Sequence, residues 1–124
     1  PPYWYATLFH AWMDDSQDLA REFGAKNQNR QRIRVLGANA VQRLDQMAHL
    51  LAAVDAERAS TLMGIGAGLC SLVNEAADGK ASLDAARFQA VSTRSRVARE
   101  FEPRTVTFPP GLKIPPPETE AKTP

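Results

Sequence analysis

The sequence predicts an all-α protein: a helical bundle of about four helices, with a long helical hairpin or coiled-coil core, followed by an extended proline-rich C-terminal arm. All nine prolines lie at the two ends of the chain, and none occurs from Tyr3 to Glu102. Because proline removes a backbone donor and clashes with the preceding helical turn, this absence permits long uninterrupted helices. Apolar residues also recur every three or four positions, as on one helix face. We therefore divide the chain into a helical body, residues 1–102, and an arm, residues 103–124.

The first helix is expected from Tyr3 to Phe23. Its main apolar residues stand on one face, and they are Trp4, Leu8, Trp12, Leu19 and Phe23. Gly24 follows where a left-handed C-terminal cap would lie. Aromatic residues are dense at the start of this helix and cover more than one face. This density favours a protein-interface role for Trp4, Phe9 and Trp12 over simple core packing.

The second helix carries the strongest periodic signal in the chain. Steps of four and three residues, typical of a coiled-coil seam or a long helical hairpin, join Ile33, Gly37, Ala40, Leu44, Met47, Leu51 and Val54. The same register continues from Arg58 to Leu72, so residues 31–77 form either one long helix or two. Because a small domain more often folds such a stretch back on itself, we expect a break between Ala56 and Thr61.

The third helix, from Ser60 to Asp78, is apolar almost all round, which indicates a central place in the bundle or in an oligomer. Small residues follow one another along it at Ser60, Gly64, Gly68 and Ser71. Since glycine inside a helix costs about 1 kcal/mol relative to alanine, we expect Gly64 and Gly68 to form a close contact with another helix. The only cysteine, Cys70, lies in the apolar run and is expected to be buried.

The fourth helix follows a turn at Asp78-Gly79 and is expected to be capped by Ser82. Its seam repeats every seven residues through Leu83, Ala90 and Val97 and ends near Phe101.

The arm combines proline runs, which favour extended polyproline II chain, with apolar residues that a solvated linker does not need. These are Val106, Phe108, Leu112 and Ile114. We expect the arm to pack in an apolar groove as far as Ile114, either on its own helices or on a neighbouring subunit. On this basis we assign Phe108, Leu112 and Ile114 to a protein interface.

Charge is nearly balanced over the whole chain, at +1, so no overall field attracts DNA or an acidic membrane. The distribution is uneven, because the segment 26–43 contains basic residues and no acid. We take Lys26, Arg30, Arg32 and Arg34 as candidate contacts to nucleic acid or to an acidic partner. The alternative is that they form ion pairs within the chain, with acids of the first helix or with Asp55, Glu57, Glu75 and Asp78.

No pattern indicates a catalytic, metal or cofactor site. His10 and His49 lie on different expected helices. Each has an aspartate one helical turn away, Asp14 for His10 and Asp45 for His49, and such a pair supplies two metal ligands at most. The glycines of residues 64–68 lack the preceding strand and the Lys-Ser/Thr pair of a phosphate-binding loop. We therefore expect neither enzymatic activity nor a cofactor.

The most apolar stretch, Leu62 to Val73, is too short to span a bilayer, and no signal-peptide pattern opens the chain. A lone cysteine forms no intrachain disulfide, which suits a reducing, cytoplasmic location. Because the first residue is not Met, a removed N-terminal leader is kept as an alternative. The expected function is a non-enzymatic interaction or assembly protein, acting as a homo-oligomer or as a subunit of a larger complex. The alternative is a nucleic-acid-binding accessory protein that uses the segment 26–43.

Overall fold

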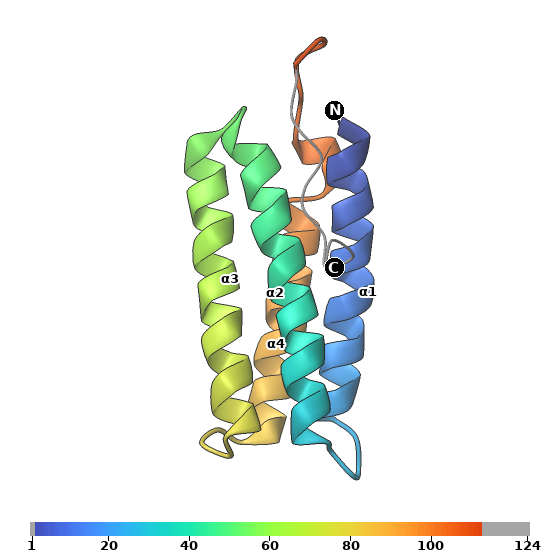
Figure 1. The fold of residues 1–124 in the computed structure, drawn as a ribbon, viewed down its shortest axis with the longest axis vertical. Coiled ribbons are helices and arrows are strands. Elements are labelled where there is room, and N and C mark those ends of the chain that lie inside the picture. Colours follow the sequence, from blue (N-terminus) through green and yellow to red (C-terminus); the bar gives the residue numbers. More distant parts are fainter. Residues whose placement is uncertain (1, 113–124) are drawn as a thin grey trace, which may run out of the picture.

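The computed structural model describes residues 2–112 and confirms the predicted all-α class, with four helices and no strand among these residues. The helices are α1 (Pro2–Phe23), α2 (Arg30–Ala52), α3 (Ala56–Ala77) and α4 (Leu83–Glu100), followed by a 3-10 turn, η1 (Pro103–Thr105). They run side by side along the long axis of the molecule (Figure 1). α2 lies between α1 and α3, and α1 also packs on α4. The contact between α3 and α4 is the least extensive of the four.

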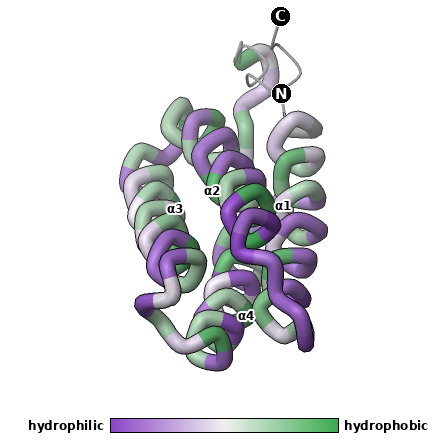
Figure 2. The backbone as a smooth tube through the Cα atoms, turned by 60° about the horizontal axis from the view of Figure 1, so that its bottom comes forward, coloured by the Kyte–Doolittle hydropathy of each residue, from purple (hydrophilic) through white to green (hydrophobic). Residues whose placement is uncertain are grey.

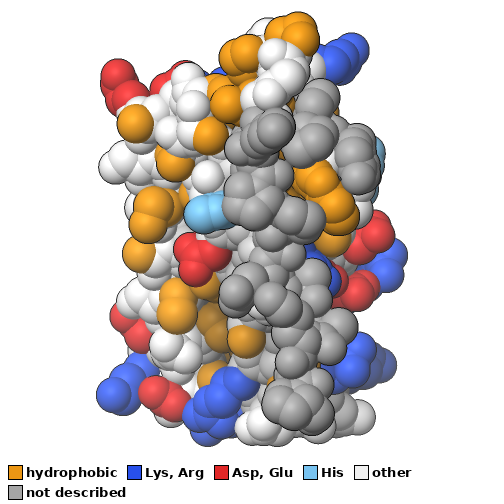
Figure 3. All heavy atoms as spheres, turned by 45° about the horizontal axis from the view of Figure 1, so that its top comes forward, with side chains coloured by type: hydrophobic (Ala, Val, Ile, Leu, Met, Phe, Trp, Pro, Cys, Tyr) orange, Lys and Arg blue, Asp and Glu red, His pale blue; other side chains and the backbone are white. Residues whose placement is uncertain are grey.

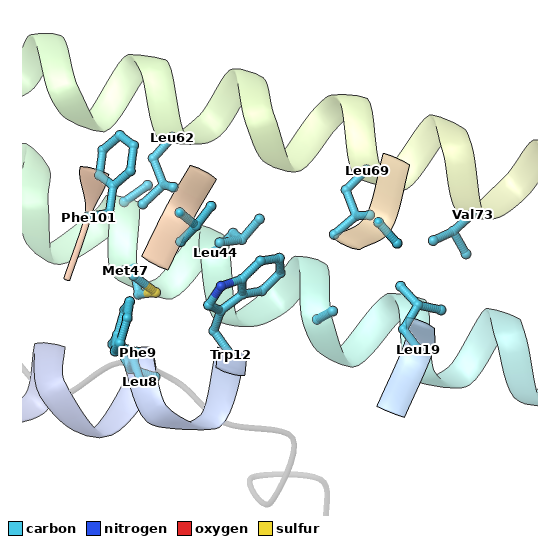
Figure 4. Close-up of a cluster of buried hydrophobic side chains, with 14 of the residues drawn as sticks. Leu8, Phe9, Trp12, Leu19, Leu44, Met47, Leu62, Leu69, Val73 and Phe101 are labelled. Atoms are coloured by element: carbon cyan, nitrogen blue, oxygen red, sulfur yellow. The ribbon is translucent and has the colours of Figure 1, made fainter. Parts of the chain in front are cut away.

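The predicted seam of α2 forms the centre of the core. Ile33, Ala40, Leu44, Met47 and Leu51 are all buried. Trp12 extends from α1 toward Leu44 and Met47, and Leu62 and Leu69 approach from α3 (Figure 4). The four-three spacing therefore identified the buried face of α2 correctly.

The break between α2 and α3 lies earlier than predicted. α2 ends at Ala52, and α3 begins at Ala56 instead of Ser60. The carboxylate of Asp55 caps α3 by accepting the Arg58 backbone N–H at 3.1 Å. The register also changes, because α3 buries Ala59, Leu62, Gly66, Leu69 and Val73, each one position after a residue of the continued α2 register. A short loop reverses the chain here. The rotation of α3 about its own axis is therefore independent of the α2 register.

The turn between α3 and α4 is the one that the sequence predicts. Gly79 adopts the left-handed conformation (φ +76°), and the next N–H, of Lys80, donates to the Glu75 carbonyl at 2.8 Å. This pattern satisfies carbonyls at the helix end. Ser82 then caps α4, and its hydroxyl oxygen accepts the Ala85 N–H at 3.3 Å.

The predicted left-handed cap at Gly24 is wrong. Among the described residues only Gly79 and Gly111 have a positive φ. The N–H of Gly24 instead donates to the carbonyls of Ala20 and Arg21, at 3.3 and 3.1 Å, which closes the last turn of α1 without a left-handed residue.

The first part of the arm packs on the helices of its own chain. Phe108 is buried, with its ring centroid 5.9 Å from that of Tyr5, and Val106 and Leu112 pack against the same core. Within residues 103–112, the apolar side chains of the arm therefore pack on the helices of their own chain. Ile114 lies outside the described residues.

Arg58 ties the arm to the end of α4. Its guanidinium lies 5.1 Å from the Phe101 ring centroid and donates to the carbonyls of Glu100 and Thr105, the latter at 2.8 Å. Tyr5 on α1 completes the junction by donating its hydroxyl to the Phe101 carbonyl at 2.7 Å. Burial raises the pKa of Tyr5 above its ordinary value, against the opposing effect of the Arg58 charge, so this donor stays protonated.

Replacing Phe108 with alanine should lower the free energy of unfolding by about 2 kcal/mol, the value of burying a phenylalanine side chain, and leave the oligomeric state unchanged. Urea unfolding and sedimentation measure the two quantities. The control is Val35→Ala, at a half-exposed position on α2, for which we expect a change within about 0.5 kcal/mol. An unfolding free energy unaffected by Phe108→Ala would show that the arm contributes nothing to the body.

Candidate protein-interaction surface

The aromatic residues of α1 are mostly core residues rather than interface residues. Trp12 is 0% exposed and Phe9 is buried beside it, while Trp4 is partly buried. The predicted interface role of Phe9 and Trp12 is therefore wrong for the folded chain. The reason is that α1 packs against both α2 and α4, so that two of its faces are covered, which the periodicity of one helix does not show.

The close helix contact occurs at Gly37 instead of at Gly64 and Gly68. A Cβ atom at Gly37 would lie 2.4 Å from Cγ1 of Val73, whereas among the described residues a Cβ placed at Gly64 or Gly68 would meet no atom within 4 Å beyond its chain neighbours and the adjacent backbone of its own helix. Within the chain, the close helix contact that we predicted at Gly64 and Gly68 is instead formed by Gly37 of α2 and Val73 of α3. The two α3 glycines face outward.

The outward side of α3 lacks charge. No charged residue occurs between Arg58 and Glu75, and the exposed positions in this stretch are Ser60, Thr61, Met63, Gly64, Ala67, Gly68, Cys70, Ser71 and Asn74. Cys70, which we predicted to be buried, is one of them. Pale and green colours dominate α3 in Figure 2, and hydrophobic and uncharged atoms extend along it at the left of Figure 3. Solvated helix faces in globular proteins usually carry charges.

A groove separates this side of α3 from α4. Its volume is about 220 Å³. Three apolar side chains of α3 (Ile65, Leu69 and Leu72) line it, and α4 contributes Gln89, Thr93 and Arg96, with Gly68 also at its wall. The limited contact between α3 and α4 leaves this groove open.

α4 also exposes two large apolar side chains. Phe88 is 72% exposed and Val91 44%. They belong to a stripe at steps of four, three and four, Asp84, Phe88, Val91 and Ser95, which lies roughly opposite the buried residues Ala86, Ala90 and Val97. Sequence reasoning missed this stripe, although its spacing is visible beside the core seam. We call the uncharged side of α3, the groove and Phe88 together the α3–α4 face.

The basic segment is partly neutralised inside the chain. Arg32 pairs with Glu22 at 3.0 Å and Arg34 with Asp78 at 2.7 Å, which are ion pairs of the kind that we named as the alternative. Lys26 is exposed. The beginning of this segment, residues 26–32, is hydrophilic and appears as a purple stretch through the α1–α2 loop and into the start of α2 in Figure 2.

The described residues offer no metal centre, since no group of three or more His, Cys, Asp and Glu in 2–112 is placed to hold an ion. His10 and His49 are exposed, on α1 and α2. None of the helices in the described part of the chain is long and apolar enough to cross a membrane.

Comparison with protein-family models, curated proteins and solved structures found no match to the chain.

Proposed function

We propose that this chain is a non-enzymatic interaction protein that assembles through the α3–α4 face, with further copies of itself or with a helix of a larger complex. The observation that carries the proposal is the pairing of an uncharged, small-residue side of α3 with an exposed Phe88 on α4.

Physical chemistry favours a protein partner for such a surface. Interface cores are depleted in charged residues and enriched in aromatic ones, and burying an exposed phenylalanine contributes about 1.5–3 kcal/mol. The groove between α3 and α4 accepts side chains from an opposing helix. Gly64 and Gly68, with open space around them, permit a close approach of its backbone.

Nucleic acid has less support as the partner. Two of the four candidate basic residues, Arg32 and Arg34, are engaged in ion pairs, and binding phosphate would require these pairs to open. The α3–α4 face itself carries few cations to contact phosphate, since Arg96 and Arg99 both pair with Glu100.

Site-specific photocrosslinking tests the proposal. A benzophenone-bearing amino acid replaces Phe88 in one variant and Val35, a half-exposed apolar residue of α2, in the matched control. After irradiation of cells that express the chain, we expect a discrete covalent adduct from position 88 and none from position 35. If position 88 gives no adduct and the purified chain sediments as a monomer, the proposal is wrong.

A further inference from the structure

We infer that the end of the bundle at which α1 passes into α2 and α3 into α4 binds the phosphate backbone of duplex DNA. The α1–α2 loop (residues 24–29) and the α3–α4 loop (residues 78–82) both lie at this end, at the bottom of Figure 1. We call residues 24–31, 78–82 and Arg87 the loop end. It shares no residue with the α3–α4 face, so the inference goes beyond the proposed function and does not depend on it.

Four exposed cations of the loop end have no ionic partner. Lys26 and Arg30 come from one stretch of the sequence, and Lys80 and Arg87 from another. Among the described residues, none of these four side chains forms an ion pair or a hydrogen bond. Because only the fold brings the two stretches to one end of the molecule, the sequence did not reveal the group. Charges that no carboxylate neutralises are available to an anionic ligand.

A glycine in each loop lets an arginine lie against the backbone. Nη2 of Arg30 lies 3.0 Å from the position that a Cβ of Gly79 would take, in the α3–α4 loop. Likewise, Nε of Arg87 lies 3.1 Å from the Cβ position of Gly24, at the end of α1. Each arginine therefore reaches from its own helix to a loop between two others. As a result, each loop carries one guanidinium from a neighbouring helix and one lysine of its own.

Most carboxylates near this end are already neutralised. Glu75 accepts the Ser71 hydroxyl at 3.4 Å, and Asp84 lies in the first turn of α4, where the helix N-terminus stabilises negative charge. Over residues 18–34 and 75–87, seven Lys and Arg stand against five Asp and Glu, so this end keeps an excess of positive charge without opening any ion pair. The other three carboxylates are held in the pairs Asp18–Arg21, Glu22–Arg32 and Asp78–Arg34.

The composition of the loop end favours phosphate over a protein partner. Neither loop exposes a large hydrophobic side chain, whereas the binding energy of protein interfaces comes mainly from aromatic and other anchor residues in packed pockets. The exposed side chains of Asn27 and Gln31 offer amide donors of the kind that bind phosphate oxygens. Charge and hydrogen-bond donors without apolar anchors are typical of contacts to a nucleic-acid backbone.

The spacing of the two guanidinium groups suits the two strands of a duplex. Gly24 follows the last turn of α1 and Gly79 that of α3. Both helices pack on α2 and on α4, so α1 and α3 lie diagonally across the bundle. Neighbouring helices about 10 Å apart give a diagonal of about 14 Å. Since the major groove of B-DNA is about 12 Å wide, the two loops can contact phosphates on both of its sides.

Fluorescence anisotropy of a labelled DNA duplex of random sequence, titrated with the full chain, tests the inference. We expect a dissociation constant of about 10⁻⁴–10⁻⁶ M at physiological salt, the range of non-specific binding. Four phosphate contacts predict a slope of about −3.6 for the logarithm of the binding constant against that of the salt concentration. Binding should therefore weaken about a hundredfold between about 50 and 200 mM salt.

Two double variants remove the cations of one loop each. Lys26→Ala/Arg87→Ala acts on the α1–α2 loop, and Arg30→Ala/Lys80→Ala acts on the α3–α4 loop. We expect each to raise the dissociation constant at least about tenfold at low salt and to reduce the magnitude of the salt slope by about 2. Circular dichroism checks that the helices are retained.

The matched control is Arg99→Ala/Arg104→Ala, which removes the same charge from exposed positions at the other end of the bundle. It should change the dissociation constant less than about threefold, because these residues lie away from the proposed phosphate contacts. An equal loss in the control would mean that only the total charge of the chain matters, and the inference would be wrong.

Three other results would also overturn it. The first is a wild-type chain that does not bind the duplex at low salt, or binds it with a salt slope shallower than about −1, a measurement that needs no variant. The second is wild-type affinity in both loop variants. The third is binding of poly-glutamate or of phosphatidylserine vesicles at least as tight as that of the duplex, which would assign the loop end to an acidic protein or to a membrane.

Discussion

Replacing Gly37 with alanine should destabilise the bundle by about 2 kcal/mol, although alanine is the better helix former. The new Cβ would lie 2.4 Å from Cγ1 and 2.7 Å from Cγ2 of Val73, far closer than van der Waals contact. Overpacking of this kind costs about 1–3 kcal/mol, which exceeds the gain of up to about 1 kcal/mol in helix propensity. Urea unfolding monitored by circular dichroism measures the difference.

Two controls isolate the contact at Gly37. Gly64→Ala, where the space around the new Cβ is open, should stabilise the protein by about 0.5–1 kcal/mol. Val73→Ala removes the opposing methyl groups, so the double variant Gly37→Ala/Val73→Ala should be less destabilised than the sum of the single variants. Additive single effects, or a stabilising Gly37→Ala, would contradict a close approach of α2 and α3 at this point.

Replacing Trp12 with alanine should have the largest effect on stability, a loss of about 3–5 kcal/mol in the free energy of unfolding. Trp12 is 0% exposed and lies between α1 and α2 beside Leu44 and Met47 (Figure 4). The space that it leaves is enclosed by helices whose backbones cannot collapse into it. Chemical denaturation gives the value.

The variant Trp12→Phe distinguishes the contribution of the aromatic ring to stability from that of the indole N–H. The indole Nε1 is buried without a hydrogen-bond partner in the described structure, and an unsatisfied buried donor costs about 1–3 kcal/mol. Phenylalanine loses ring volume but also removes this donor, so we expect a net cost of no more than about 1 kcal/mol. A loss as large as that of the alanine variant would mean that the N–H is satisfied in solution.

Much of the local structure was predictable from the sequence because its causes are local. The left-handed turn needs Gly79, the cap of α4 needs a hydroxyl at Ser82, and two of the three predicted seam residues of α4, Ala90 and Val97, are buried, while Leu83 is partly buried. Each of these signals depends on residues within one or two helical turns.

The candidate surface was less predictable. Gly64 and Gly68 were correctly assigned to one strip, yet the strip faces outward. The most exposed large hydrophobic side chain among the described residues, Phe88, was missed. Periodicity shows which residues share a face of a helix, and it does not show which of two apolar faces turns toward the neighbouring helices.

The sequence by itself determined the all-α class, most of the helix ends and the buried seam of α2, since hydrophobic spacing, proline placement and caps act within a single segment. Only the tertiary structure decided that α3 starts at Ala56 with a shifted register, that α2 and α3 approach closely at Gly37, and that Arg58 anchors the arm. These features depend on how each helix is rotated against its neighbours. That rotation is set by the packing of all four helices together, and no single segment contains the information.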